Sequence, residues 1–272
     1  EALEWQPPTF VESGARYTGQ WLENLRHGEG MLERPDGGRY EGTFRKGKSH
    51  GRGKFTAANG SVYEGLWEAD KAHGQGTYTK ANGAKYSGQW YQDLKSGTGS
   101  EQFSNGACYN GDFLEGKKHG EGVYWSPDGI SYEGQWRCDC MDGEGTYVFS
   151  DRRTYTGQWK QDQMNGKGKM AWPSGTSYEG QYVNSVKSGQ GVLTFSDGRI
   201  YSGSFLNGHQ HGKGTAIAAD GKMLRGSWQN GVLIEDFAGE SATAKSRAHS
   251  MDDDDSTESA QDSASMASLS SR

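Results

Sequence analysis

One stretch of the chain reads Tyr63-Glu64-Gly65-Leu66-Trp67, continues through Gly74-Gln75-Gly76 and Asn82-Gly83, and begins again at Tyr86. The unit returns every 23 residues, and we count positions within it from its leading tyrosine, which is position 0. Any account of fold or function must explain this array. The tyrosines that open repeats 1 to 9, and the leucine that opens a tenth copy, are Tyr17, Tyr40, Tyr63, Tyr86, Tyr109, Tyr132, Tyr155, Tyr178, Tyr201 and Leu224.

The alternation within a repeat is that of a β-strand. In residues 86–90 the apolar or small residues stand at every second place, which is the period of a strand with one buried face, and the helical period of 3.6 is absent. A second strand is expected after the Gly-x-Gly pair, as in residues 122–126, so the segment that ends in His-Gly-x-Gly is predicted to be a loop. With 43 Gly and only 32% hydrophobic residues, the chain must build its core mainly from aromatic rings, at about 150–250 Å² each.

A turn signal closes the predicted second strand in most repeats. It is an Asn-Gly or Asp-Gly pair, such as Asn59-Gly60, and these pairs favour a two-residue hairpin turn with both central residues at positive φ. In repeat 6, Asp151-Arg152 takes this place, and a positive φ costs a non-glycine residue about 1 kcal/mol. Either this copy is simple drift, or the turn changes type and the copy bends the array or carries a specific contact.

Glycines at positions 2, 11 and 13 stand inside or beside the predicted strands. A lone glycine weakens a sheet there unless another group approaches the backbone closely. We therefore expect an aromatic ring from the adjoining repeat to lie over Gly19, Gly42 and Gly65.

These residues carry a family resemblance. Tyr-x-Gly-x-Trp/Phe, a segment ending in His-Gly-x-Gly, and Asp/Asn-Gly on a 23-residue period closely resemble the MORN (membrane occupation and recognition nexus) repeat over residues 14–232. The resemblance implies an all-β fold, an elongated and twisted array of antiparallel β-hairpins with one hairpin per repeat, which agrees with the strand and turn patterns.

Composition divides the chain into three segments. Residues 1–13 are a lead-in that caps the first hairpin, residues 14–234 are the repeat array, and residues 235–272 are a tail without a repeat. The tail has nine acidic and three basic residues, which accounts for the net charge of −6, and its low hydrophobicity predicts disorder. Ser250 and Ser256 lie near acidic residues and are predicted phosphorylation sites.

Charge and cysteine content restrict the class of protein. The remaining chain carries 26 residues of each charge sign, so it gives no basic footprint for nucleic acid. The odd count of three cysteines, Cys108, Cys138 and Cys140, favours a reducing compartment. We expect a cytoplasmic protein, peripheral to a membrane or to the cytoskeleton or cilium.

The repeated histidines and the Gly-x-Gly pairs are better explained by packing and by the repeat than by metal binding or catalysis. Successive repeats should lie roughly 10 Å apart, whereas zinc ligands lie about 2.1 Å from the metal, so the repeated histidines are predicted to pack and hydrogen-bond within their loops. The Gly-x-Gly pairs open no helix and lack a Walker lysine. We predict no catalytic, cofactor or metal site, and no enzyme. The histidines are His27, His50, His73, His119 and His211.

Two surfaces remain as binding candidates. The aromatic stripe at position 4 could anchor a protein partner, although most of its rings are expected to form the core. Basic loops could align to hold anionic lipid heads, although solvated loop charge is the favoured interpretation. The predicted partner-binding residues are Trp67, Trp90, Trp136 and Trp159, and the predicted lipid-binding residues are Lys46, Lys48, Lys71, Lys95, Lys117 and Lys118.

The sequence as a whole favours a non-enzymatic scaffold that binds a protein partner along the array, with a homo-oligomer through the open sheet edges as a further expectation. One alternative is an adaptor that binds phosphoinositides or anionic phospholipid, as the MORN resemblance implies. Another is the regulatory MORN region of a phosphatidylinositol phosphate kinase whose catalytic domain lies outside this chain.

Overall fold

The computed structural model describes residues 2–11 and 14–237, and the chain divides at Ser126 and Pro127 into two compact units. Every regular element is a β-strand, and the described residues contain no helix long and apolar enough to cross a membrane. The predicted all-β fold of one hairpin per repeat is confirmed. Residues Ser250 and Ser256 of the acidic tail lie outside the described residues.

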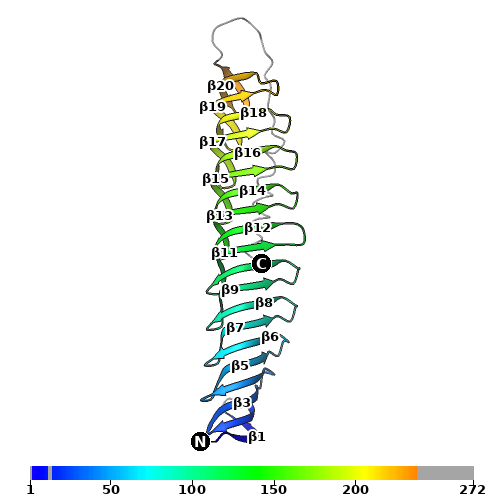
Figure 1. Ribbon diagram of the computed structural model, residues 1–272, viewed down its shortest axis with the longest axis vertical. Coiled ribbons are helices and arrows are strands. Elements are labelled where there is room, and N and C mark those ends of the chain that lie inside the picture. The colour runs from blue at the N-terminus through cyan, green and yellow to red at the C-terminus, as the bar shows by residue number, and fades with distance from the viewer. Residues whose placement is uncertain (1, 12–13, 238–272) are drawn as a thin grey trace. The chain divides into compact units, whose positions relative to one another are not determined.

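In the first unit each strand pairs antiparallel with the next strand along the chain (Figure 1). The lead-in supplies a strand of its own, in which Trp5 stands opposite Gln20. The strands are β1 (Glu4–Phe10), β2 (Arg16–Leu22), β3 (Leu25–Glu33), β4 (Arg39–Arg45), β5 (Lys48–Thr56), β6 (Val62–Glu68), β7 (Lys71–Thr79), β8 (Lys85–Tyr91), β9 (Leu94–Gln102), β10 (Cys108–Leu114) and β11 (Lys117–Trp125).

The second unit repeats the same antiparallel pairing from one strand to the next. Its last strand belongs to the tenth repeat and ends two residues beyond the predicted array boundary at 234. The strands are β12 (Ser131–Arg137), β13 (Cys140–Val148), β14 (Thr154–Lys160), β15 (Gln163–Ala171), β16 (Ser177–Val183), β17 (Val186–Thr194), β18 (Ile200–Leu206), β19 (His209–Ile217), β20 (Met223–Gln229) and β21 (Val232–Asp236).

The tight turn of each hairpin lies at the opposite end from the one predicted. Between β6 and β7, Ala69 and Asp70 have φ of 50° and 70°, the pair of positive values that matches the twist of the flanking strands. Asn59 and Gly60 instead lie in the five-residue connection between β5 and β6, where only Gly60 has a positive φ, at 85°. The Asn59 side chain accepts the Ser61 N–H at 2.9 Å, as in an Asx turn, so the prediction of a tight turn there is wrong.

The segment predicted as a loop is part of a strand. His73, Gly74 and Gly76 all lie in β7, and the pairing register with β6 shifts at a bulge between Gly65 and Trp67. Gly74 takes a φ of 65° there, which a residue with a Cβ adopts only with strain. The glycine of position 11 is therefore a requirement of the bulge.

A glutamine at position 3, which sequence reasoning did not single out, secures the bulge in several repeats. The Gln158 Oε1 accepts the backbone N–H of Lys167 at 2.8 Å, directly after the bulge glycine Gly166. The recurrence of glutamine at this position is the signal that could have revealed this role. The equivalent glutamines that make the same bond are Gln20, Gln89, Gln135 and Gln181.

The connection in repeat 6 keeps the conformation of the other repeats. Arg152 adopts a φ of 72°, its N–H donates to the Phe149 carbonyl at 2.9 Å, and the Asp151 side chain accepts the Arg153 N–H as Asn59 does in repeat 2. Of the two alternatives, a change of turn type is therefore wrong and the usual connection is kept, because the surrounding hydrogen bonds hold Arg152 in the left-handed region.

Candidate functional site

Each leading tyrosine lies over the glycines of its own repeat. The Tyr63 hydroxyl donates to the Leu66 carbonyl at 2.9 Å, and a Cβ added to Gly65 would lie 2.7 Å from that hydroxyl. Gly65 and Gly76 stand opposite each other across β6 and β7, so the ring covers both. Burial raises the pKa of Tyr63 to about 12. The ring over the glycines thus comes from the same repeat, and the expectation of a ring from the adjoining repeat is wrong.

The residues of position 4 join successive tyrosines into a ladder of edge-to-face rings. The Tyr63 ring centroid lies 5.0 Å from Trp67 of its own repeat and 5.2 Å from Trp90 of the next. The Trp67 indole also donates to the Gly53 carbonyl of the preceding repeat at 3.1 Å. Such contacts contribute about 0.5–1.5 kcal/mol each beyond burial, so this ladder is the core of each unit.

The structure places the four predicted partner-binding tryptophans in this ladder. Trp136 and Trp159 are only 2% and 3% exposed, while Trp67 and Trp90 are half-buried. Their role toward a partner stays a prediction, and Trp90 is the one whose ring forms a wall of the pocket described below.

The predicted lipid-binding lysines do not form one continuous surface. Lys46, Lys48, Lys71 and Lys117 are exposed at tight turns, so their binding to lipid stays a prediction. Acidic residues such as Glu23, Glu68 and Glu115 lie in or beside the same series of turns.

The other two predicted lysines face inward. The Lys118 ammonium is 5.5–5.6 Å from the ring centroids of Phe103, Tyr109 and Tyr124, and the residue is 2% exposed. The assignment of Lys118 to a lipid-binding loop is therefore wrong, because the side chain is enclosed by rings. Lys95 is half-buried and forms an ion pair with Glu101.

The histidines and cysteines that the sequence singled out contact residues of their own or the neighbouring hairpin. His73 contacts Glu68 of its own hairpin, with Nδ1 3.3 Å from Oε2, and its ring lies 5.4 Å from Tyr91. Cys138 is exposed in a tight turn, and burial together with the Asp162 carboxylate raises the pKa of Cys140 to about 11. Across residues 2–11 and 14–237 no three His, Cys, Asp or Glu side chains are grouped to hold a metal ion.

A pocket opens in repeat 4, where a glutamate replaces the ring that repeats 2, 3, 5 and 6 carry at position 15. Position 15 holds Tyr78 in repeat 3, opposite Tyr63, but it holds Glu101 opposite Tyr86 in repeat 4. The space is about 240 Å³, and its lining combines aromatic rings with the Lys95–Glu101 ion pair. Its lining includes Tyr78, Lys80, Lys85, Tyr86, Trp90, Asp93, Leu94, Lys95 and Glu101. Glu101 is the sequence signal that could have located it.

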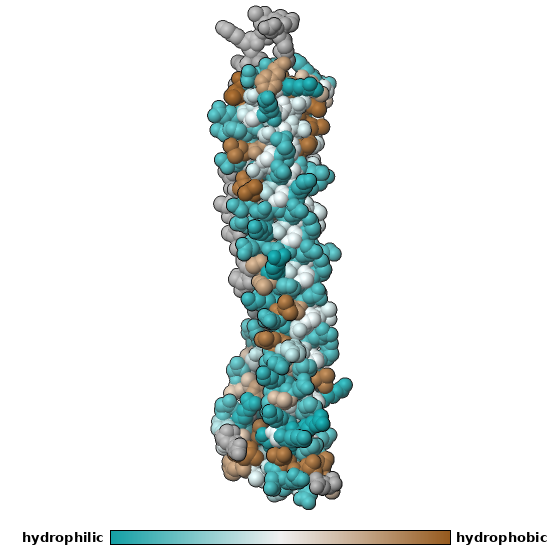
Figure 2. All heavy atoms as spheres, turned by 90° about the vertical axis from the view of Figure 1, so that its left-hand side faces the viewer, coloured by the Kyte–Doolittle hydropathy of each residue, from teal (hydrophilic) through white to brown (hydrophobic). Residues whose placement is uncertain are grey.

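Exposed apolar side chains adjoin this pocket. Tyr91, Leu94 and Leu114 are 57%, 47% and 51% exposed, and we call them the edge cluster. Tyr91 stands opposite Leu94 at the start of the β8–β9 hairpin, and Leu94 lies against Gly116 in the tight turn that follows Leu114. Figure 2 shows hydrophobic side chains as separate clusters on a mainly hydrophilic surface.

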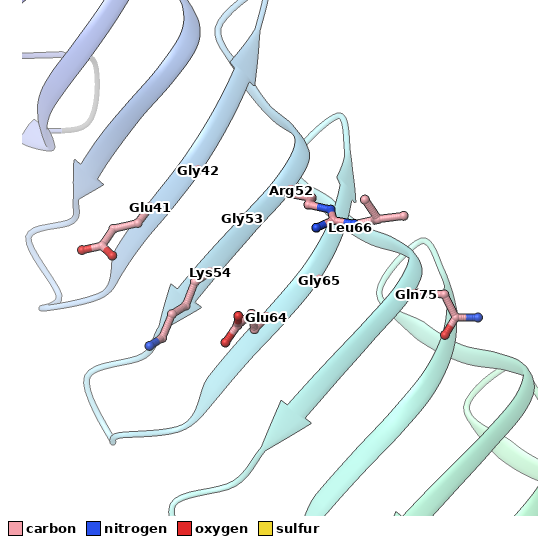
Figure 3. A pocket seen from close by; sticks show the side chains of 9 residues that line it. All are labelled: Glu41, Gly42, Arg52, Gly53, Lys54, Glu64, Gly65, Leu66 and Gln75. Atoms are coloured by element: carbon pink, nitrogen blue, oxygen red, sulfur yellow. The ribbon is translucent and has the colours of Figure 1, made fainter.

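The face opposite the tyrosines carries a shallow groove in repeats 2 and 3, of about 630 Å³. Figure 3 shows Glu41, Lys54 and Glu64 on one side of its glycine floor, with Arg52 and Leu66 on the other. The second unit has a similar groove of about 540 Å³, again with acidic and basic side chains. Because both signs of charge line each groove, neither selects a partner by charge.

Comparison with solved structures gives low similarity. The TCP10 domain of Danio rerio CPAP is 17% identical, with a TM-score of 0.40 over 76% of this chain and 98% of that one. The G-box domain of the microcephaly protein CPAP is 15% identical, with a TM-score of 0.41 over 65% and 93%. The TCP domain of Drosophila melanogaster SAS-4, solved with a proline-rich motif of Ana2, is 11% identical, with a TM-score of 0.35 over 65% and 90%. We draw no argument about function from these scores.

Comparison with curated protein sequences gave no match. Comparison with protein families matches the MORN repeat nine times. The matched residues are 17–39, 40–62, 63–85, 86–108, 109–131, 132–152, 155–177, 178–198 and 201–223. These segments cover most of the chain and begin at the leading tyrosines that the structure places over their glycines, so the chain belongs to the MORN repeat family.

Proposed function

We propose that this chain is a non-catalytic scaffold that binds a protein partner through the edge cluster of repeats 4 and 5. MORN repeats are repeat modules that are generally non-catalytic, which agrees with this role. The observation that carries the proposal is the exposure of Tyr91, Leu94 and Leu114 side by side at two consecutive tight turns. Grouped exposed apolar side chains mark interaction surfaces.

The repeat itself does not require apolar residues at these places. The positions of Tyr91 and Leu94 are held in repeat 2 by Arg45 and Lys48, which are also exposed and stand opposite each other. Because the hairpin forms equally well with charged residues there, the core does not explain the edge cluster. Binding of another protein would explain the exposed apolar side chains at these positions.

A comparable cluster occurs at the same positions of the second unit. Val183 and Leu206 are 52% and 46% exposed, and Val186 lies against Gly208 as Leu94 lies against Gly116. Its recurrence supports a scaffold that offers apolar contacts to its partners in both units.

Affinity capture with matched variants tests the proposal. The Leu114→Glu variant places a charge in the edge cluster. Lys160→Glu places the same side chain at the equivalent position of repeat 7, where the wild-type residue is already charged and stands opposite Gln163. We expect at least one protein from the source cells to be retained by the wild type and by Lys160→Glu but lost with Leu114→Glu. Equal recovery on all three folded proteins would contradict the proposal.

A further inference from the structure

We propose that the repeat-4 pocket receives a tyrosine or tryptophan side chain of the partner, with acidic residues next to it in the partner sequence. The proposal rests on the proposed function and names the chemistry of the partner. It is argued from the shape of the pocket, from the polar pair inside it and from the charges at its mouth.

The pocket lies where repeats 3 and 5 carry a tyrosine ring and repeat 4 does not. Tyr78 and Tyr124 stand opposite the leading tyrosines of repeats 3 and 5, at the position that Glu101 occupies in repeat 4. In repeat 3 this ring extends toward the next repeat, with its centroid 6.4 Å from that of Trp90. A ring supplied by a partner can therefore pack in the place that the chain's own ring fills in neighbouring repeats.

The polar pair inside the pocket selects a ring with a donor. Glu101 and Lys95 form an ion pair, and their side chains are 15% and 21% exposed. The Lys95 ammonium also lies 5.1 Å and 5.4 Å from the ring centroids of Tyr86 and Phe113. A carboxylate has further acceptor sites, so a phenol O–H or an indole N–H can donate to Glu101. A phenylalanine or leucine would cover the pair without a hydrogen bond, which is unfavourable.

The charges at the mouth of the pocket favour acidic neighbours. Lys80 and Lys85 line it, are exposed, and form no ion pair with any residue that the structure describes. The Asp93 carboxylate also lines the pocket, and it accepts the Ala72 N–H at 2.8 Å. Carboxylates of the partner near Lys80 and Lys85 would be attracted and oriented by these two ammonium groups.

The pocket can be closed without disturbing the repeat. Glu101→Tyr restores the residue that repeats 3, 5 and 6 carry at this position, and Lys95 keeps its contacts with the rings of Tyr86 and Phe113. The matched control is Leu32→Tyr, which adds the same ring at the same, half-buried position of repeat 1. Unchanged thermal unfolding of both variants shows that they are folded.

The probe is a random peptide library displayed on phage and selected on the immobilised full chain. We expect the selected peptides to share a tyrosine or tryptophan beside acidic residues. Their affinity should fall by about thirtyfold for Glu101→Tyr, the loss typical of a hot spot, and stay unchanged for Leu32→Tyr. Reversing the mouth charges with Lys80→Glu and Lys85→Glu should also weaken binding.

Selection of no peptide, of peptides with apolar or basic anchors only, or of peptides that bind Glu101→Tyr as well as wild type would overturn the pocket proposal. The natural partner separates the two proposals. Partner capture that survives Glu101→Tyr but not Leu114→Glu leaves the scaffold function standing without the pocket. Capture that survives both variants contradicts both.

Discussion

The carboxylate of Asp70 accepts a hydrogen bond from the backbone N–H of Ser49, at 2.7 Å, and joins two successive hairpins beside their tight turns. The Asp70 N–H donates in return to the Ser49 carbonyl at 3.0 Å. The same link recurs between Asp93 and Ala72, at 2.8 Å from Oδ1 to N. These aspartates therefore act between repeats, as well as adopting the positive φ of the turn.

A second kind of joint replaces this link where the turn holds a glycine. The Gly47 N–H donates to the Arg26 carbonyl at 2.9 Å, and the Arg26 guanidinium lies 5.5 Å from the ring centroid of Phe44. Lys95 plays the same part in repeat 4: its carbonyl accepts the Gly116 N–H at 2.9 Å, and its ammonium packs on the ring of Phe113. In these two joints a long cation on the ring ladder pairs with a glycine in the next turn.

Removal of the Asp70 carboxylate should weaken the joint between repeats 2 and 3. Ser49 is buried, at 6% exposure, so Asp70→Ala leaves its N–H without this acceptor. We expect a loss of about 1–2 kcal/mol in the free energy of unfolding. Asp70→Asn keeps an oxygen in place and should cost much less. Urea denaturation of both variants measures the difference, and equal losses would argue against the hydrogen bond as the cause.

A side chain at Gly88 should be strongly destabilising. An added Cβ would lie 2.6 Å from the Gly99 Cα and 2.6 Å from the Tyr86 hydroxyl, and the neighbouring backbone has no room to move away. We expect Gly88→Val to lower stability by about 3 kcal/mol or more.

The control for this substitution is Gly83→Ala, where φ is 87° and a Cβ would meet nothing within 4 Å. Backbone strain alone should cost it about 1 kcal/mol. Thermal unfolding compares the two, and a similar melting temperature for both variants would show that the tyrosine does not press on Gly88.

Arg152→Gly should stabilise the second unit. Arg152 holds a φ of 72° in a connection whose hydrogen bonds match those of repeat 8, where Gly198 has a φ of 89°. Release of the strain should contribute about 0.5–1 kcal/mol. The reverse change, Gly198→Arg, should cost a similar amount. Paired denaturation curves test both, and a less stable Arg152→Gly would show that the arginine side chain makes a contact worth more than the strain.

Stability should fall as the solution becomes alkaline. Burial raises the pKa of Tyr17, Tyr63 and Tyr201 to about 12, above the ordinary value of 10, and it raises the pKa of Tyr86 and Tyr155 further. The folded state binds these protons more tightly than the unfolded state, so their contribution is complete below pH 10 and is lost between pH 10 and 12.

Melting temperatures from pH 8 to 11, together with the phenolate absorbance, measure this effect. Tyr63→Phe removes one titrating group and should make the decline less steep. A melting temperature that is constant up to pH 11 would contradict the burial of these hydroxyls.

The strand pattern could be predicted from the sequence because its cause is local. Tyr63, Gly65 and Trp67 alternate with polar residues, and a period of two is decided within a few residues. The position of the tight turn could not be predicted. Ala69-Asp70 and Asn59-Gly60 both have turn chemistry, and the choice between them depends on the register of β6 against β7.

The candidate site depends still more on neighbours. Glu101 is an ordinary substitution in the repeat until Trp90 and Tyr78 are placed beside it, when the missing ring becomes a pocket. Lys118 reads as a loop lysine until three rings enclose it. The sequence by itself determined the family, the all-β hairpins and the close approach of an aromatic ring to the strand glycines, because these follow from spacing along the chain. Only the tertiary structure decided which turns close the hairpins, which ring covers each glycine pair and which side chains remain for a partner. The first two depend on the register between paired strands, and the third depends on contacts between residues of different repeats.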